Sequence, residues 1–176
     1  MLIYCRDYKG CGIFERQMRR EEKVYNINKN TLMVINENTG YYRTRVIEKN
    51  GEFRLTESPL QIIEESCTKY GAAYEGRRET VNQILKSKTK LPIPVHPKKG
   101  IYLMPTRSFR NEKFSLISFF QVKNFTGIDK KTYVTFENNL SYYVSITAQQ
   151  FDLQMKRTGQ VIAYFHRLMF LDYLDV

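Results

Sequence analysis

The chain has 176 residues, of which 42% are hydrophobic and 14% are aromatic. This length and composition exclude a disordered chain and a very small fold that depends on metal ions or disulfides, so they predict one folded domain. The formal net charge of +10 at pH 7 favours a polyanionic partner, with nucleic acid first and an anionic membrane surface second.

Residues 1–24 mix charges of both signs and follow neither a helical nor a strand period. We interpret them as a vestigial or misassigned N-terminal extension, with Met18 marking an internal start; the alternative is a short hairpin. They contain no apolar stretch of the length that a signal peptide needs. The three cysteines are an odd number, and Cys5 and Cys11 lack a zinc spacing, which predicts a cytoplasmic protein without a metal or other cofactor.

Residues 25–55 alternate short strand-like segments with turn residues. The expected strands are residues 25–27, 31–35, 41–47 and 52–55. Asn50 and Gly51, between the last two, form a dipeptide typical of a tight hairpin turn. These strands and turns predict a four-stranded antiparallel β-meander. Because the segment is close to neutral, we predict that this meander serves as scaffold.

The clearest helix of the sequence is predicted over residues 58–70. Ser58 is suited to cap the first amides, Gln61 to bond back to the cap amide, and Pro59 to occupy the first helical position. An apolar stripe at helical spacing consists of Leu60, Ile63, Cys67 and Tyr70. The stripe predicts that this helix packs on a core and that Cys67 is a buried free thiol.

The segment from Arg77 to Lys113 holds ten Lys or Arg residues against two Glu residues, and so carries most of the net charge. We predict a second helix from about Arg77 to Leu85, then an extended arm over residues 86–99 whose prolines exclude helix. The candidate DNA-binding residues are Arg77, Arg78, Lys86, Lys88, Lys90, Lys98, Lys99, Arg107 and Arg110. We expect them to converge on one exposed ridge.

Arg77 and Arg78 are expected in the first turn of that helix, where the helix dipole disfavours cations, and this indicates an anionic partner. We predict that both insert into a minor groove narrowed by A-tracts, while the lysines contact phosphates and set the register. Two alternatives remain, namely a solvated basic surface and pairing of the arginines with Glu75 or Glu79.

A strand is expected at residues 101–104 after the arm. Further strands at residues 116–125, 132–136 and 140–144 are predicted to form a second antiparallel meander. The aromatic pairs Phe119–Phe120 and Tyr142–Tyr143 are suited to stack on the bases of a single strand. Neighbouring residues of a strand point to opposite faces, so we expect one member of each pair to lie in the core.

A C-terminal helix is predicted to begin at the capping pattern Thr147 to Gln150, with Gly159 as the site of a bend or break. The candidate self-association face consists of Phe165, Leu168, Met169 and Leu171. The alternative is a helix packed between the two meanders. Charged residues interrupt the apolar run after residue 161, which argues against a membrane span.

Together these elements predict an α+β fold, with two antiparallel β-meanders, helices packed on them and a C-terminal helix. No internal repeat, low-complexity tract or Gly/Ser linker supports a domain boundary. We therefore expect residues 25–176 to form a single DNA-binding domain.

The sequence offers little for catalysis. Only Cys67 with His96 or His166 could supply a nucleophile and a base, and Cys67 is expected in the core. Glu64 and Glu65 point to different sides of a helix, and the glycines match neither nucleotide-binding fingerprint. We predict a binding protein and not an enzyme.

Several short motifs follow one another in the order and at the spacing of a known family. They are Pro59-Leu60-Gln61-Ile62-Ile63, Ser66-Cys67, Tyr70-Gly71, Tyr74, Gly76-Arg77-Arg78, Lys90 with Pro92-Ile93, and Tyr102-Leu103-Met104-Pro105-Thr106. In these motifs the chain resembles the ComK family, the competence transcription factors of low-GC Gram-positive bacteria, from about Tyr25 to about Ser145.

The resemblance implies a sequence-specific activator, associated with the nucleoid in the bacterial cytoplasm, that binds A·T-rich boxes of double-stranded DNA and bends them in the minor groove. It also implies a homo-oligomer whose turnover depends on an adaptor and the Clp protease machinery. The family's usual long charged tail, associated with multimerisation and turnover, is shorter here, and residues 1–24 are an addition. The alternatives are a shortened ComK-like protein-interaction module and a single-stranded nucleic-acid-binding protein.

Overall fold

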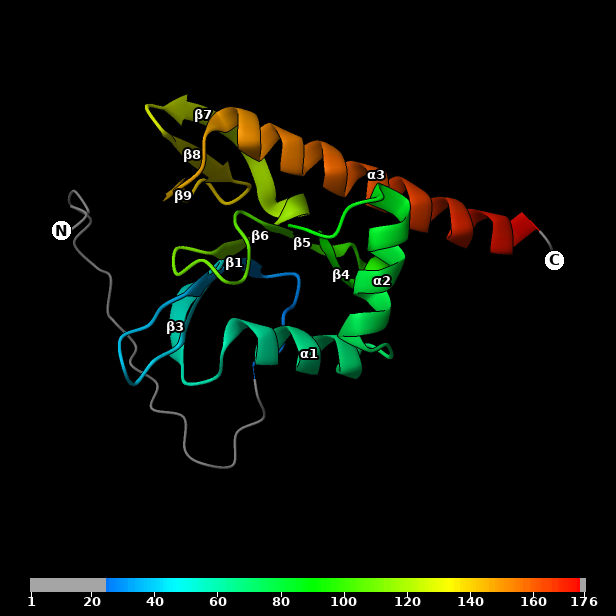
Figure 1. Ribbon diagram of the computed structural model, residues 1–176, viewed down its shortest axis with the longest axis horizontal. Coiled ribbons are helices and arrows are strands. Elements are labelled where there is room, and N and C mark those ends of the chain that lie inside the picture. The colour runs from blue at the N-terminus through cyan, green and yellow to red at the C-terminus, as the bar shows by residue number, and fades with distance from the viewer. Residues whose placement is uncertain (1–24, 175–176) are drawn as a thin grey trace.

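Two antiparallel sheets and three α-helices form the regular structure of residues 25–174, the part of the chain that the computed structural model describes (Figure 1). In chain order the elements are β1 (Thr31–Asn36), β2 (Thr44–Glu48), β3 (Gly51–Leu55), α1 (Pro59–Lys69), α2 (Tyr74–Leu85), β4 (Ile93–His96), the 3₁₀ turn η1 (Pro97–Lys99), β5 (Ile101–Pro105), β6 (Ser115–Ser118), the 3₁₀ turn η2 (Phe119–Gln121), β7 (Val122–Ile128), β8 (Lys131–Phe136), β9 (Ser141–Val144) and α3 (Ala148–Leu174). The predicted α+β class, antiparallel sheets and C-terminal helix are confirmed. The predictions for residues 1–24 lie outside the described residues.

The larger sheet joins strands from both expected meanders. Its order is β3-β2-β1-β6-β5-β4, and all neighbours pair antiparallel. The expected strand 116–125 is divided by η2, because β6 is buried between β1 and β5 whereas β7 pairs with β8 in a separate three-stranded sheet. Residues 25–27 form no strand; instead the Ile27 amide donates to the Ser66 hydroxyl at 2.9 Å, which ties this segment to α1.

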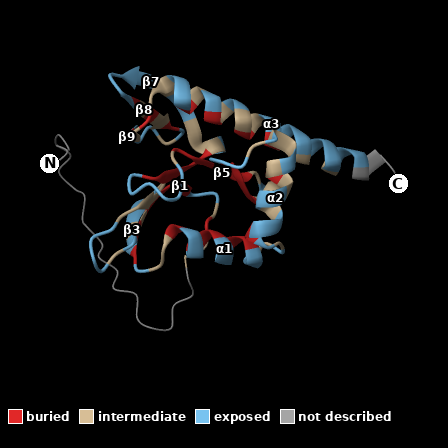
Figure 2. Cartoon of the chain, in the orientation of Figure 1, coloured by how far each residue is buried: buried red, intermediate tan, exposed pale blue. Residues whose placement is uncertain are grey.

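α1 covers one face of the six-stranded sheet and begins where the capping pattern predicts. The Ser58 hydroxyl accepts from the Gln61 amide at 3.3 Å, and the Gln61 side chain accepts from the Ser58 amide at 2.8 Å. Figure 2 shows the buried residues of α1 on its sheet-facing side. Leu60 is exposed, while Ile62 and Ile63 are fully buried, so the prediction of Leu60 as a packing residue was wrong. The buried face of α1 is rotated relative to the predicted stripe, because Ile62 and not Leu60 faces the sheet.

Cys67 is confirmed as a buried free thiol on α1. Burial raises the pKa of Cys67 to about 11, so the folded protein holds this proton more tightly than the unfolded chain. The protonated Cys67 thiol therefore contributes to the free energy of unfolding at neutral pH, and this contribution is lost as the pH rises from about 9 through 11.

We expect iodoacetamide at pH 8 to leave Cys67 unmodified in the folded protein and to modify it after unfolding in urea, because the thiolate is the reactive species. Peptide mass mapping of residue 67 measures this difference. Equal rates of modification in the folded and unfolded protein would contradict the burial of the thiol.

α3 packs its first half on the three-stranded sheet, and its last part extends beyond both sheets (Figure 1). Phe151 is 1% exposed, and its ring centroid lies 4.7 Å from that of Phe125 in β7. The predicted cap is present, because the Thr147 hydroxyl accepts from the Gln150 amide at 3.3 Å. The helix continues through Gly159, so the predicted break does not occur.

Three apolar clusters hold these layers together. One lies between α1 and the six-stranded sheet, and a second lies between the two sheets below α3. The third joins α2, the β4–β5 edge and α3 through Val81, Leu91, Tyr102 and Val161. Within the described residues, no helix combines the length and the apolar character needed to cross a membrane.

Candidate nucleic-acid interface

α2 begins at Tyr74, earlier than the predicted start at about Arg77. Glu75 therefore occupies the first turn, where the helix dipole favours a carboxylate, and both arginines follow it. The prediction that Arg77 and Arg78 lie in the first turn was wrong. The dipole of α2 therefore no longer supports the inference that an anionic partner binds beside these two arginines.

The two arginines have different surroundings. Arg78 is exposed and donates to a Glu75 carboxylate oxygen at 3.0 Å, which is the pairing given above as an alternative. An exposed pair of this kind contributes about 0–1 kcal/mol, so Arg78 can exchange it for another anion. Arg77 is half-buried, donates to the Tyr70 carbonyl at 3.5 Å, and has its pKa lowered by burial. Arg77 therefore holds α2 against the end of α1.

The predicted extended arm over residues 86–99 is not an arm. Residues 91–95 are buried, and β4 pairs with β5 as the edge strand of the larger sheet. Prolines are accepted there because an edge strand leaves one row of backbone positions without a neighbour. Lys86, Lys88 and Lys90 lie on the turn before β4, and Lys98 and Lys99 lie on η1 after it.

The antiparallel pairing of β4 with β5 divides the candidate cations between two ends of the sheet. Ile93 pairs with Leu103 and His96 with Ile101, so the start of β4 lies beside the end of β5. One end therefore carries the turn 86–92 and the β5–β6 loop with Arg107 and Arg110; the other end carries Lys98 and Lys99. The structure does not bring all nine cations to one ridge.

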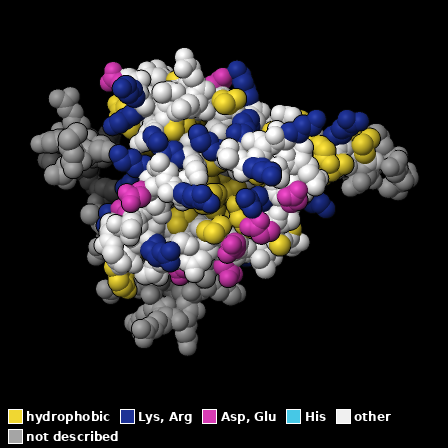
Figure 3. All heavy atoms as spheres, viewed as in Figure 1, with side chains coloured by type: hydrophobic (Ala, Val, Ile, Leu, Met, Phe, Trp, Pro, Cys, Tyr) yellow, Lys and Arg dark blue, Asp and Glu magenta, His cyan; other side chains and the backbone are white. Residues whose placement is uncertain are grey.

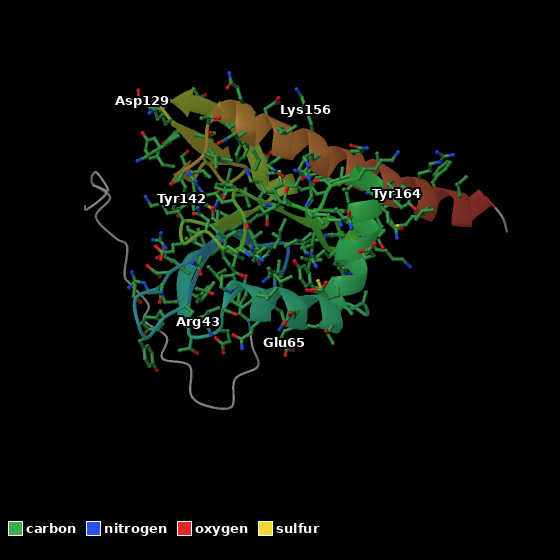
Figure 4. The ribbon with its side chains drawn as sticks, viewed as in Figure 1. Arg43, Glu65, Asp129, Tyr142, Lys156 and Tyr164 are labelled. Atoms are coloured by element: carbon green, nitrogen blue, oxygen red, sulfur yellow. The ribbon has the colours of Figure 1, made fainter. Side chains whose placement is uncertain are left out.

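A shallow hollow lies at the start of β4. Its lining consists of Tyr74, Arg78, Leu91, Pro92, Ile93 and Pro94. In Figure 3, Lys and Arg side chains surround a central patch of apolar side chains, and acidic side chains gather over α1, where Figure 4 labels Glu65. We call Arg78, Lys86, Lys88, Lys90, Arg107 and Arg110 the basic face. In the described part of the chain, Arg78 alone of these six has an acidic partner.

Arg157 of α3 fixes the turn before β4, and sequence reasoning missed it. Its guanidinium donates to the Ser87 hydroxyl at 3.0 Å and to the Thr89 carbonyl at 2.9 Å. Burial lowers the pKa of Arg157. No local pattern could reveal this contact, because the partners are far apart in the chain. The turn that carries Lys88 and Lys90 is therefore fixed to α3 by these two hydrogen bonds.

Arg107 is partly structural. It is half-buried and donates to the carbonyl of Ser145, which joins the β5–β6 loop to the end of β9. Arg110 lies further along the same loop and is exposed. Arg110 is therefore the residue of this loop that is free to contact a large partner.

The aromatic pairs behave as predicted. Phe119 and Tyr142 pack against the core between the sheets, whereas Phe120 and Tyr143 are 47% and 49% exposed. The described residues contain no group of three or more His, Cys, Asp or Glu side chains that could hold a metal ion.

The predicted self-association residues differ in exposure. Phe165 and Met169 are half-buried, and the Phe165 ring centroid lies 6.4 Å from that of Tyr102. Leu168 and Leu171 are exposed on the part of α3 that extends beyond the sheets. α3 packs through Phe151 and Val161 on the sheets and α2, as the alternative expects, whereas apolar side chains of its last turns are exposed.

Residues 22–169 match the family model described as ComK protein. The chain belongs to the ComK family. It is 33% identical over 153 residues to the competence transcription factor of Bacillus subtilis (strain 168), and this match covers 86% of the chain and 77% of that protein. No solved structure matches the chain.

The ComK match extends beyond the motifs of the resemblance and includes most of α3. The motif residues mainly organise the fold: residues 59–63 open α1, and residues 102–106 include most of β5. Arg78 and Lys90 are the exceptions of functional interest, because both are ComK motif residues that are exposed on the basic face.

Proposed function

We propose that this ComK-family chain is a transcription regulator that binds A·T-rich double-stranded DNA through the minor groove. The observation that carries the proposal is the basic face, whose cations come from α2, the following turn and the β5–β6 loop. One of them, Arg78, borders the apolar hollow at the start of β4. Its relative in B. subtilis is described as a competence transcription factor, which supports the regulatory role. Such a protein would act on the nucleoid in the bacterial cytoplasm.

Each part of the basic face suits a different contact. Arg78 lies beside the hollow, and an arginine is attracted by the negative potential of a narrow A-tract minor groove. The lysines of the turn are suited to contact phosphates on either side and to fix the register. Because Arg157 already orders that turn, little conformational entropy is lost on binding.

We further propose that the exposed end of α3 mediates self-association. Leu168 and Leu171 are 44% and 43% exposed there, with Phe165 and Met169 half-buried beside them. A helix with apolar residues on several sides is stable in water only when another surface covers it.

Affinity for an A·T-rich duplex is expected to fall with salt at a slope of log K against log salt of about −4 to −5, if five cations of the basic face contact phosphates. Fluorescence anisotropy between 50 and 300 mM salt measures the slope, with a G·C-rich duplex of equal length as control. We expect the A·T-rich duplex to bind more tightly at every salt concentration. A slope near zero, or equal affinity for both duplexes, would refute the proposal.

Binding of single strands is the second candidate function. Phe120 and Tyr143 expose ring surface on which bases could stack, and Tyr143 lies 4.9 Å from Tyr133 between ring centroids. Competition between the A·T-rich duplex and one of its strands separates the two functions, since the basic face predicts preference for the duplex.

A further inference from the structure

A half-open cavity of about 430 Å³ lies at the end of the sheet opposite the basic face. Its walls come from the turn before β1, η1, the start of β5, η2 and α3. Among the residues that the structure describes, the lining includes Lys29, Lys98, Lys99 and His166 and contains no carboxylate. The cavity therefore offers positive charge without internal neutralisation, which suits a small anion.

Two buried polar atoms of the lining have no hydrogen-bond partner among the described residues. Tyr102 is 1% exposed and its hydroxyl is unpaired, and the Gln121 side-chain carbonyl is unpaired as well. The Gln121 amide donates to the Lys29 carbonyl at 3.1 Å, which fixes the side chain and leaves its oxygen as an acceptor. Burial raises the pKa of Tyr102 to about 12, so the hydroxyl keeps its proton. Both atoms have almost no accessible surface, so they lie behind the cavity wall, and a ligand in the cavity contacts the exposed groups of the lining instead.

An aromatic wall completes the cavity. Phe120 is 47% exposed, and its ring centroid lies 6.1 Å from that of Tyr102. Gly100 has a φ of +68°, and a Cβ at this position would lie 3.5 Å from the Phe120 ring, so the turn closes directly against the ring. The exposed side of Phe120 is suited to contact a flat heterocycle.

We propose that this cavity binds a nucleoside monophosphate. Its phosphate contacts Lys98 and Lys99, and its base lies against Phe120. The volume falls within the range of about 300–1,000 Å³ that is typical of small-molecule sites. A duplex is too wide to enter such a cavity and would reach only the lysines at its rim. The site is separate from the basic face, so a bound nucleotide and DNA do not exclude each other.

Isothermal titration of the full chain with three probes tests the proposal. AMP carries both phosphate and base, adenosine lacks the phosphate, and ribose 5-phosphate lacks the base. We expect AMP to bind at least tenfold more tightly than either fragment, because each fragment leaves one half of the site without a partner. Replacing the base, with GMP, CMP and UMP as further probes, identifies which base the cavity prefers.

The variant Lys98→Ala/Lys99→Ala is expected to weaken AMP binding by about tenfold for each lysine removed. Lys130→Ala/Lys131→Ala is the matched control, since it removes the same charge from exposed positions outside the cavity and should leave AMP binding unchanged. His166→Ala, at a second exposed position of the lining, should also weaken AMP binding. Thermal melts confirm that each variant is folded.

Three results would overturn the proposal: no binding of any nucleotide, equal loss in the control variant, or equal affinity for AMP and ribose 5-phosphate. If Lys98→Ala/Lys99→Ala instead weakens only duplex binding, the two lysines belong to the DNA interface and the nucleotide site does not exist. Duplex binding by the unmodified chain is measured separately, so failure here leaves the proposed DNA function intact.

Discussion

The variant Arg78→Ala/Lys88→Ala/Arg110→Ala is expected to bind an A·T-rich duplex roughly a thousandfold more weakly than the unmodified chain at low salt, at about tenfold for each lost phosphate or groove contact. The three residues come from α2, the following turn and the β5–β6 loop, so together they sample the whole basic face. The slope of log K against log salt should become less negative by about 2, because Lys88 and Arg110 are the two phosphate contacts removed. Anisotropy titrations with the same duplex measure both changes.

The control for this variant is Lys123→Ala/Lys130→Ala/Lys131→Ala, which removes the same charge from exposed positions on β7, β8 and their turn. It should retain most of the affinity. Equal loss in both variants would show that net charge alone determines binding. Arg77 is left unchanged because it is half-buried and bonded to the Tyr70 carbonyl, so its removal would also affect stability.

Phe151→Ala is expected to lower the free energy of unfolding by about 3–5 kcal/mol, since it leaves a cavity where α3 docks on the three-stranded sheet. Phe151 is 1% exposed and packs on Phe125 at 4.7 Å between ring centroids. Urea unfolding followed by circular dichroism measures the change. If the alanine variant does not fold, Phe151→Leu provides a measurable intermediate loss of about 1 kcal/mol.

Leu153→Ala is the matched control on the same helix, because Leu153 is 55% exposed. Its effect should stay within about 0.5 kcal/mol. A large loss on removing Leu153, or a loss below about 1 kcal/mol on removing Phe151, would contradict the docking of α3 described here.

Features that depend on residues three or four apart were predictable from the sequence. The caps at Ser58 and Thr147 are examples, because each is completed within one helical turn by Gln61 or Gln150. The burial of Cys67 was predictable for a similar reason. The apolar stripe of a helix packs on the core, and a small apolar residue within that stripe is buried with it.

Features that depend on distant partners were not predictable. The residues around 116–125 have strand character throughout, and only the pairing of Ile117 with both Met33 and Met104 shows that β6 belongs to the larger sheet. Leu60 and Ile62 are both apolar, so local spacing could not decide which of them faces that sheet.

The candidate site was predicted in its residue types but not in its geometry. Spacing along the chain placed all the cations between Arg77 and Arg110 in one segment. The antiparallel return from β4 to β5 then separates Lys98 and Lys99 from the others. The contact of Arg157 with the turn before β4 requires the docking of α3, which no pattern in the basic segment contains.

Pro94 in β4 and Pro92 just before this strand restrict how copies of this protein can assemble. Proline has no backbone N–H, and on an edge strand it is accepted where that group would have faced outward. Pro92 and Pro94 thus deprive the outer rim of the larger sheet of two donors, and an incoming strand would find no continuous ladder there. Open-ended fibrils that grow by strand addition at β4 are therefore disfavoured.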